Sequence, residues 1–237
     1  MKFEKLGRFG VFCSDNHKFG TDAVLLADFA SPKSGERMCE FGCGCGIITM
    51  LCCQKQADLS VNAVDIQSEA VHLARLSAEK NGITDRVSVE CADLRDFSAE
   101  HKAQFDLVVM NPPYKKAGAG LVSGNKARDI ARFETCGTID EIAFAAAEVL
   151  RYQGRFCICH RPERLGDAIK AMYSAGLTPK KLRTVSQNKN SRISLVLLEA
   201  RNGGGDGMTV CPPLFIEDES ERLFKDYFSE ERRKTDV

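Results

Sequence analysis

Short apolar runs alternate with amphipathic stretches along most of the chain. The apolar runs predict seven strands, at residues 37–41, 61–65, 87–91, 105–110, 154–160, 180–186 and 192–200. Helical periodicity predicts helices at 46–56, at 68–81 with Ser68 as N-cap, at about 138–151 and at about 163–175. This alternation is typical of an α/β protein whose mostly parallel sheet is covered by helices on both faces. Because only a short polar loop separates the last two strands, we expect them to form an antiparallel hairpin at the sheet edge.

The segments outside this alternation are expected to be additions to it. Residues 1–36 predict a hairpin followed by a helix at Thr21–Ala30, with Thr21 as its N-cap. Residues 202–237 begin with a glycine-rich link and continue as an acidic tail, in which we expect one short strand and a helix. The predicted organisation is therefore an appendage at 1–36, a main domain at 37–201 and a Gly-linked tail at 202–237.

The composition is that of a globular protein, with 237 residues, 43% hydrophobic and 28% charged. The 33 basic and 33 acidic residues balance, which excludes a uniformly basic nucleic-acid binder but allows a local basic face. No apolar run approaches the roughly 18 residues that span a membrane, and the first residues lack the apolar segment of a secretion signal. We therefore expect a cytoplasmic protein that does not enter a membrane.

Eleven cysteines raise the question of a metal site or a disulfide framework. Their number is odd, no secretion signal precedes them, and none forms the C-x-x-C pair of a zinc knuckle. Cys157 and Cys159 lie two residues apart in one predicted strand, so their side chains share one face. We expect reduced thiols that pack as small apolar residues, and no metal site.

Charge is distributed unevenly behind the neutral total. Residues 115–133 carry a net charge of +4 and residues 151–201 a net charge of +8, whereas residues 134–150 carry −4. A charged run is most often a solvated surface. Two separate basic segments, one of them directly after a candidate catalytic motif, favour a surface for nucleic acid.

A glycine-rich loop follows the first strand of the alternation and opens a helix. It reads E-F-G-C-G-C-G over residues 40–46, and glycines let a backbone turn tightly and approach a ligand closely. A nicotinamide-dinucleotide fingerprint, G-x-G-x-x-G, needs a small residue where this chain has Ile47. The pattern E-x-G-x-G-x-G instead resembles the S-adenosylmethionine loop of class I methyltransferases.

Two carboxylates extend this interpretation. Asp65 ends the second strand, where an acidic side chain can accept hydrogen bonds from ribose hydroxyls. Asp93 follows the third strand, where methyltransferases commonly place a side chain against the adenine amine. The loop and both acids in register favour S-adenosylmethionine as the cofactor over a tight turn that holds no ligand.

The motif Asn111-Pro112-Pro113-Tyr114 follows the fourth strand. Two adjacent prolines fix the backbone and remove two N–H donors, which leaves carbonyls there free to accept. The Asn111 oxygen and a neighbouring carbonyl can both accept from one exocyclic amine, localise its lone pair and direct it at a methyl group. The ring of Tyr114 can stack on a base. The motif belongs to the amino-methyltransferases of adenine, cytosine, guanine and glutamine, whose chemistry needs no metal.

Further segments resemble one family. H-K-F-G-T-D-A-V-L-L-A-D-F-A, I-A-R-F-E and C-P-P-L-F-I-E-D, together with the glycine loop and N-P-P-Y-K-K-A-G-A-G, resemble the bacterial tRNA(Val) adenine-N6-methyltransferases, which modify the adenosine 3′ of the anticodon. The resemblance covers most of residues 9–220. It implies a Rossmann-like class I methyltransferase fold with a mostly parallel seven-stranded sheet, S-adenosyl-L-methionine as the cofactor and tRNA as the partner. No obligate protein partner is inferred.

The resemblance also implies roles for individual residues. Those expected to touch the cofactor are Gly42, Gly44 and Gly46 at its methionine end, Glu40 at its amino group, Thr21 and Asp22 beside the methionine, Asp65 at the ribose, Asp93 at the adenine, and Asn111. Those expected to hold the target base are Asn111, Pro112 and Tyr114. Two positions depart from the family pattern, because Glu40 replaces the more usual aspartate and Phe133 stands where a histidine is expected.

The basic segments supply the expected RNA contacts, which are Lys115, Lys116, Lys126, Arg128, Arg132, Lys189 and Arg192. A protein-glutamine methyltransferase is the first alternative, since it shares N-P-P-Y. Such enzymes usually carry a separate N-terminal helical domain, however, and a basic surface suits RNA phosphates better than a protein substrate. A non-catalytic RNA-binding module is the second alternative, and an intact Asn111 beside an intact glycine loop disfavours it.

Overall fold

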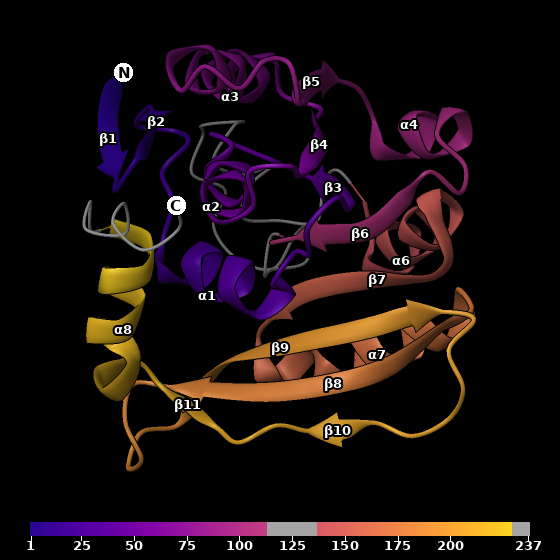
Figure 1. Cartoon of the computed structure of the whole chain (residues 1–237). Helices are drawn as coiled ribbons and strands as arrows, with labels where there is room; N and C mark the ends of the chain where they lie inside the picture. The colour runs from indigo at the N-terminus through magenta and orange to yellow at the C-terminus, as the bar shows by residue number, and fades with distance from the viewer. Residues whose placement is uncertain (113–136, 229–237) are drawn as a thin grey trace.

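The computed structural model of the protein describes residues 1–112 and 137–228. A nine-stranded sheet forms its centre (Figure 1). The strands are β3 (Arg37–Phe41), β4 (Ser60–Asp65), β5 (Val87–Cys91), β6 (Phe105–Met110), β7 (Leu150–His160), β8 (Leu177–Ser186), β9 (Ile193–Asn202), β10 (Thr209–Val210) and β11 (Leu214–Phe215). They lie in the order β10-β8-β9-β7-β6-β3-β4-β5, and β11 also pairs with β8.

The seven expected strands are all present. Strands β5, β4, β3, β6 and β7 run parallel to one another, and β9 runs antiparallel to both β7 and β8. The mostly parallel sheet with an antiparallel hairpin is therefore confirmed. The hairpin is not the outer edge, however, because the two-residue strands β10 and β11 of the tail pair in parallel with β8.

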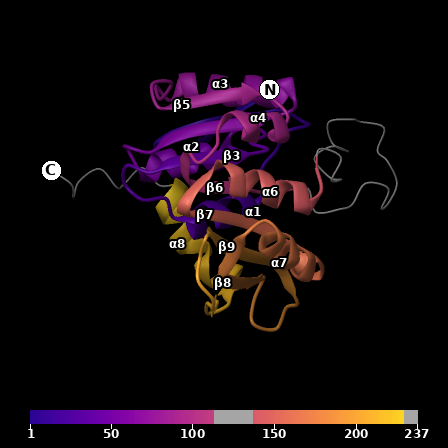
Figure 2. The same cartoon turned by 90° about the vertical axis from the view of Figure 1, so that its right-hand side faces the viewer.

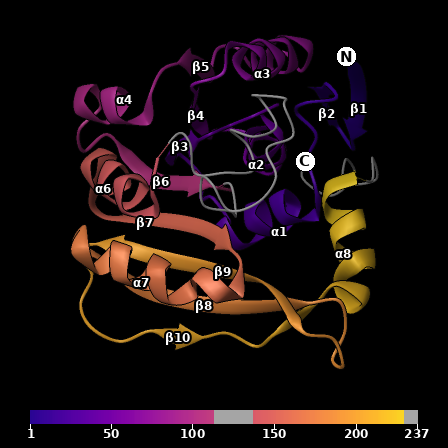
Figure 3. The same ribbon diagram turned by 180° about the vertical axis from the view of Figure 1, so that it is seen from behind.

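Helices cover both faces of the sheet, as expected. On one face lie α1 (Thr21–Ala30), α2 (Ile47–Lys55) and α3 (Ser68–Lys80), and on the other lie α4 (Leu94–Glu100), α6 (Ile139–Val149) and α7 (Leu165–Ser174). Figure 2 shows the strands between α2 on one side and α6 and α7 on the other, and Figure 3 shows α6 and α7 in front. Along β7, Cys157 and Cys159 pack on the face covered by α1, α2 and α3. Phe156 and Ile158 pack on the face covered by α4, α6 and α7. The shared face predicted for the two cysteines is confirmed.

The N-caps of two helices differ from expectation. Gly20 is the N-cap of α1 and Gln67 is the N-cap of α3, so Thr21 and Ser68 are the first helical residues and neither side chain caps its helix. Backbone geometry decides this, because both N-cap residues are already extended. The Gln67 N–H also donates to Asp65 Oδ1 at 2.9 Å, which fixes the turn that precedes α3.

Helix α4 was not predicted. It has seven residues, too few to display a helical period, and its N-cap Asp93 accepts a hydrogen bond from the Arg95 N–H. Helix α6 ends at Val149 and β7 begins at Leu150, so the helix is shorter and the strand longer than expected. The strand starts early because Leu150 pairs with Phe105 of β6.

The N-terminal hairpin consists of β1 (Lys2–Leu6) and β2 (Phe9–Cys13), which form a separate antiparallel sheet. The side chain of Asn81, which follows α3, forms with β2 the two backbone hydrogen bonds that a neighbouring strand would form. The Gly10 N–H donates to Asn81 Oδ1 at 2.9 Å, and the Gly10 carbonyl accepts from Asn81 Nδ2 at 2.7 Å. The hairpin is thereby attached to the same helix layer that packs against the glycine loop.

The tail ends in α8 (Ile216–Phe228), which returns to the N-terminal helix. Asp28 of α1 accepts hydrogen bonds from Arg222 at 2.9 Å, from Lys55 at 3.0 Å and from the Tyr227 hydroxyl at 3.3 Å. Tyr227 is fully buried. The tail thus contains two short strands and a helix, one strand more than expected. Within the described ranges, no helix has the length and apolar character of a membrane span.

Candidate cofactor and substrate site

The carboxyl ends of parallel strands form the edge where open α/β sheets bind their ligands. The glycine loop follows β3, Asp65 ends β4, Asp93 follows β5 and Asn111 follows β6. Because these strands pair in parallel, all four features lie at the same edge of the sheet. The topology therefore brings together residues that are up to 71 positions apart in the sequence.

The three glycines of the loop adopt conformations that other residues rarely adopt. Their φ angles are +63° at Gly42, +54° at Gly44 and +81° at Gly46. A Cβ at Gly46 would lie 3.1 Å from the Cβ of Ala74 in α3, so this glycine also permits close helix packing. A Cβ at Gly44 would meet nothing within 4 Å. The backbone at Gly44 therefore borders open space in which a ligand can approach it.

Asp65 connects the loop to the start of α3. Its side chain is 7% exposed, and its two oxygens accept one hydrogen bond each, from the Gly44 N–H and the Gln67 N–H, both at 2.9 Å. Burial raises the pKa of Asp65, and the two backbone hydrogen bonds oppose that rise. Since a carboxylate has about four acceptor positions, Asp65 keeps the capacity to accept from ligand hydroxyls.

Glu40 lies under the loop and is 2% exposed. Its Oε2 accepts from the Thr49 N–H at 2.9 Å and from the Thr49 hydroxyl at 2.5 Å. Burial raises the pKa of the Glu40 carboxyl to about 8. The carboxyl therefore joins the end of β3 to the first turn of α2, and the predicted contact with the amino group of the cofactor stays a prediction.

Asp93 forms an ion pair with Arg95, for which the sequence pattern gave no signal. Arg95 donates from Nε to Oδ1 at 2.8 Å and from a terminal nitrogen to Oδ2 at 2.5 Å. Arg95 also lies 3.2 Å from Glu141 of α6. This pairing with Arg95 lowers the pKa of Asp93. The adenine contact stays a prediction, and it requires Asp93 to share its carboxylate between Arg95 and the ligand.

Asn111 and Pro112 are the described part of the N-P-P-Y motif. Asn111 follows β6 directly, and its Oδ1 accepts a hydrogen bond from the Cys159 thiol at 3.1 Å. Cys159 belongs to the neighbouring strand β7 and is fully buried. The contact fixes the oxygen of the Asn111 amide, the atom that the proposed amine activation uses. Tyr114 lies outside the described residues.

Thr21 and Asp22 open α1, which packs against α2. Thr21 is exposed and Asp22 is partly exposed. Their predicted place beside the methionine of a cofactor is compatible with this position and stays a prediction.

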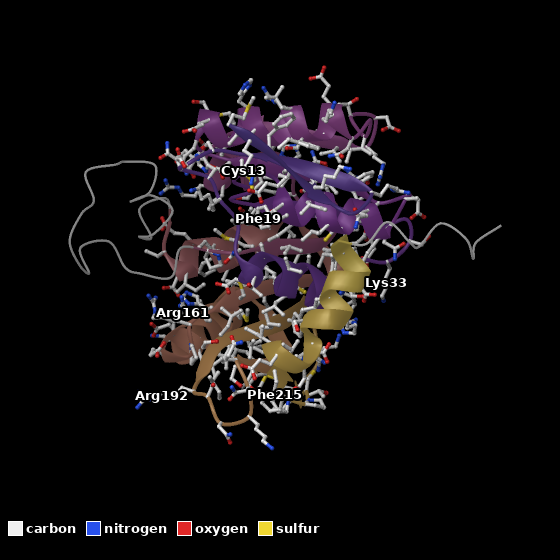
Figure 4. The ribbon with its side chains drawn as sticks, turned by 90° about the vertical axis from the view of Figure 1, so that its left-hand side faces the viewer. Cys13, Phe19, Lys33, Arg161, Arg192 and Phe215 are labelled. Atoms are coloured by element: carbon white, nitrogen blue, oxygen red, sulfur yellow. The ribbon has the colours of Figure 1, made fainter. Side chains whose placement is uncertain are left out.

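Basic side chains approach the same sheet edge from β7 and the β8–β9 loop. Strands β7 and β8 point the same way, since both are antiparallel to β9. Lys189 and Arg192 lie exposed in the loop after β8. Arg161, which the sequence analysis missed, directly follows β7 and donates to the Ser194 carbonyl at 3.0 Å. Figure 4 shows Arg161 and Arg192 on the same flank.

The signal that identifies Arg161 is its position directly after a parallel strand within the basic segment 151–201. The remaining residues expected to contact RNA lie outside the described residues: Lys115, Lys116, Lys126, Arg128 and Arg132. Among the residues that the structure describes, no group of three or more histidine, cysteine, aspartate or glutamate side chains is arranged to hold a metal ion.

Two relatives of this chain carry the name tRNA1(Val) (adenine(37)-N6)-methyltransferase. The protein from Escherichia coli O157:H7 is 29% identical over 183 residues, which are 76% of this chain and 74% of the relative. The protein from Cronobacter sakazakii is 28% identical over 201 residues, which are 84% and 80%. The solved structure of a predicted O-methyltransferase from Agrobacterium tumefaciens is similar in fold, with a TM-score of 0.69, 20% identity, and coverage of 86% of this chain and 96% of that chain.

A family model that matches this chain is named for its methyltransferase activity. The model of the methyltransferase small domain matches residues 3–166, which contain most of the N-terminal hairpin, the glycine loop, both carboxylates and N-P-P-Y. The match covers more than half of the chain. This protein therefore belongs to the methyltransferase small domain family.

Proposed function

We propose that this protein transfers a methyl group from S-adenosylmethionine to the N6 amine of an adenosine in tRNA, beside the anticodon of tRNA(Val). The observation that carries the proposal is Asn111, which follows β6 at the sheet edge that also holds the glycine loop. The names of the two relatives supply the substrate class. We expect the enzyme in the cytoplasm, where tRNA is found.

The residues present fit the cofactor. Gly44 borders open space, so a ligand can lie against the loop backbone. Asp65 keeps acceptor capacity for ribose hydroxyls after its two backbone hydrogen bonds. S-adenosylmethionine supplies the reactive methyl group when bound. The part of the protein is to hold the acceptor amine in line with that methyl group and to exclude other geometries.

Asn111 is the residue that we expect to prepare the amine. An adenine amine is a poor nucleophile because its lone pair is delocalised into the ring. Acceptance of its hydrogens by Asn111 Oδ1 and by a backbone carbonyl of the motif localises that pair. The Cys159 thiol donates to the same oxygen and so helps to hold the amide in place.

The basic residues at this edge suit a tRNA substrate. Arg161 and Arg192 lie on one flank, with Lys189 in the same loop as Arg192. Each can neutralise a backbone phosphate beside the target nucleotide, because phosphate contacts position a nucleic acid without reading its sequence. Sequence choice would then depend on the shape of the folded tRNA.

The test is mass spectrometry of nucleosides from unmodified tRNA that has been incubated with the purified protein and S-adenosylmethionine. Wild type should form N6-methyladenosine, and Asn111→Ala should form essentially none with little loss of cofactor affinity, because its oxygen acts mainly on the substrate amine. A bacterial release factor serves as the competing protein substrate. Methylation of glutamine in that factor, with no methylated adenosine in any tRNA, would favour the protein-methyltransferase alternative and contradict the proposal.

A further inference from the structure

One buried side chain near the glycine loop has no hydrogen-bond partner for one of its atoms. His17 lies in the segment that joins β2 to α1, between Cys13 and Phe19, which Figure 4 labels. The side chain is only 4% exposed. Its Nε2 nevertheless makes no hydrogen bond within residues 1–112 and 137–228. Buried polar atoms are almost always paired, so an orphaned nitrogen points to a ligand that completes it.

The neighbours of His17 place it beside the predicted ribose position. Glu69 Oε2, in the first turn of α3, lies 3.8 Å from Nε2, too far for a hydrogen bond. Glu69 instead accepts from Asn16 at 3.2 Å. Burial raises the pKa of Asp65, and the nearby His17 imidazole opposes that rise. The imidazole therefore lies at the first turn of α3, the helix whose N-cap Gln67 donates to the Asp65 carboxylate.

The chemistry around Nε2 narrows the class of ligand. Two carboxylates, Asp65 and Glu69, disfavour an anionic group there. A hydroxyl both donates and accepts, so it pairs with Nε2 in either tautomer of the ring. Asp65 beside it has remaining acceptor capacity, which suits the second hydroxyl of a vicinal diol.

We propose that His17 is a cofactor-binding residue whose Nε2 hydrogen-bonds a ribose hydroxyl of S-adenosylmethionine beside Asp65. The inference rests on the proposed function, which requires this cofactor. It gives the segment between hairpin and α1 a direct part in binding, in addition to its contacts with α3.

The test is calorimetric titration of the full chain with S-adenosylhomocysteine and with its 2′-deoxy and 3′-deoxy analogues. His17→Phe keeps an aromatic ring but removes the nitrogen, so affinity for S-adenosylhomocysteine should fall roughly two- to tenfold. For the analogue that lacks the paired hydroxyl, wild type and His17→Phe should have the same affinity. His72→Phe, at an exposed histidine of α3, is the matched control and should bind all three ligands as wild type does.

Equal affinity of wild type and His17→Phe for S-adenosylhomocysteine would overturn the proposal. An equal loss for all three ligands would overturn it too, because it would identify His17 as a packing residue. If thermal unfolding shows that His17→Phe does not fold, a second measurement replaces the comparison of affinities. It follows the NMR chemical shifts of the imidazole nitrogens in isotope-labelled wild type. S-adenosylhomocysteine and one deoxy analogue should then shift the His17 signal differently, and equal shifts with all three ligands contradict the inference.

The wild-type titration distinguishes a failure of the proposed function from a failure of the His17 contact. Absence of any wild-type affinity for S-adenosylhomocysteine would overturn the proposed function and this inference together. Normal wild-type affinity with a failed His17 comparison would overturn this inference alone.

Discussion

Asp65 is a residue whose position, but not whose contacts, can be predicted from the sequence. A carboxylate at the end of a buried strand is visible in the pattern. Its hydrogen bond to the Gly44 N–H joins residues 21 positions apart, and only the parallel pairing of β3 and β4 creates it. The same holds for His17 and Glu69, which come together through folding and leave no trace as a motif.

Asp65→Ala should weaken binding of S-adenosylmethionine by roughly ten- to a hundredfold, because a charge-assisted hydrogen-bonding group is worth about 1.5–3 kcal/mol. The structure adds a second effect. The Gly44 and Gln67 N–H groups lose their acceptor, so the unfolding temperature should fall as well. Calorimetric titration and thermal unfolding measure the two effects. Unchanged affinity would remove Asp65 from the binding site.

Glu40 makes stability depend on pH. In the folded chain burial raises the pKa of Glu40 to about 8, against an ordinary value of 4.5. The buried carboxyl therefore stays protonated in the folded state while the unfolded chain releases its proton. The contribution of Glu40 to stability is complete below about pH 4.5 and is lost as pH rises towards 8, with a slope of up to about 1.4 kcal/mol per pH unit.

Glu40→Gln should remove this pH dependence, because an amide of similar shape cannot ionise. In urea unfolding without cofactor, the variant should gain stability relative to wild type between about pH 5 and about pH 8. Glu79→Gln, at an exposed position of α3, is the control. Its change in unfolding free energy between about pH 5 and about pH 8 should equal that of wild type. Parallel pH profiles for Glu40→Gln and wild type would contradict the prediction.

At the scale of elements, the strands and the long helices follow from the sequence, whereas the shortest helix does not. Strand β6 is visible as a continuous apolar run and helix α3 as a helical period, and the pattern predicted both. Helix α4 has seven residues and follows its N-cap Asp93, for which the sequence had suggested only a contact with the ligand. The N-caps predicted at Thr21 and Ser68 were one residue too late, because extended Gly20 and Gln67 supply the N-cap conformation.

Asn81→Ala should loosen the attachment of the hairpin to α3. The substitution removes both hydrogen bonds to the Gly10 backbone, which should cost about 1–3 kcal/mol in urea unfolding. Amide exchange gives a sharper measurement, since the Phe12 N–H keeps its acceptor, the Ser77 hydroxyl. Exchange at Gly10 should therefore accelerate more than exchange at Phe12. Asn190→Ala, at an exposed loop position, should affect neither amide.

For the whole molecule, a neutral total charge conceals a charged face. The basic segment 151–201 contributes Arg161 after β7 and Lys189 and Arg192 after β8, all at the carboxyl edge of the sheet. The uneven charge is readable in the sequence. The gathering of these basic side chains at one edge of the sheet cannot be seen in the sequence, because it depends on β9 running antiparallel between β7 and β8.

Replacement of both Lys189 and Arg192 by alanine should weaken tRNA binding and reduce the log–log salt slope by about two units, since each phosphate contact releases about one counterion. Affinity for S-adenosylhomocysteine should not change. Filter binding at several salt concentrations measures the slope. A double variant with the wild-type slope would show that this loop is a solvated surface, and the RNA contacts would have to lie elsewhere.

The tail strands β10 and β11 have a consequence for contacts between copies of the chain. The unpaired edge of a long strand such as β8 is a template on which another copy can add a strand and begin to aggregate. The tail pairs with β8 at Lys181–Leu182 and at Val185–Ser186. Lys180 holds it in place through hydrogen bonds to the carbonyls of Gly205, Asp206 and Gly207. The acidic end of the chain thus shields the edge of its own sheet from self-association.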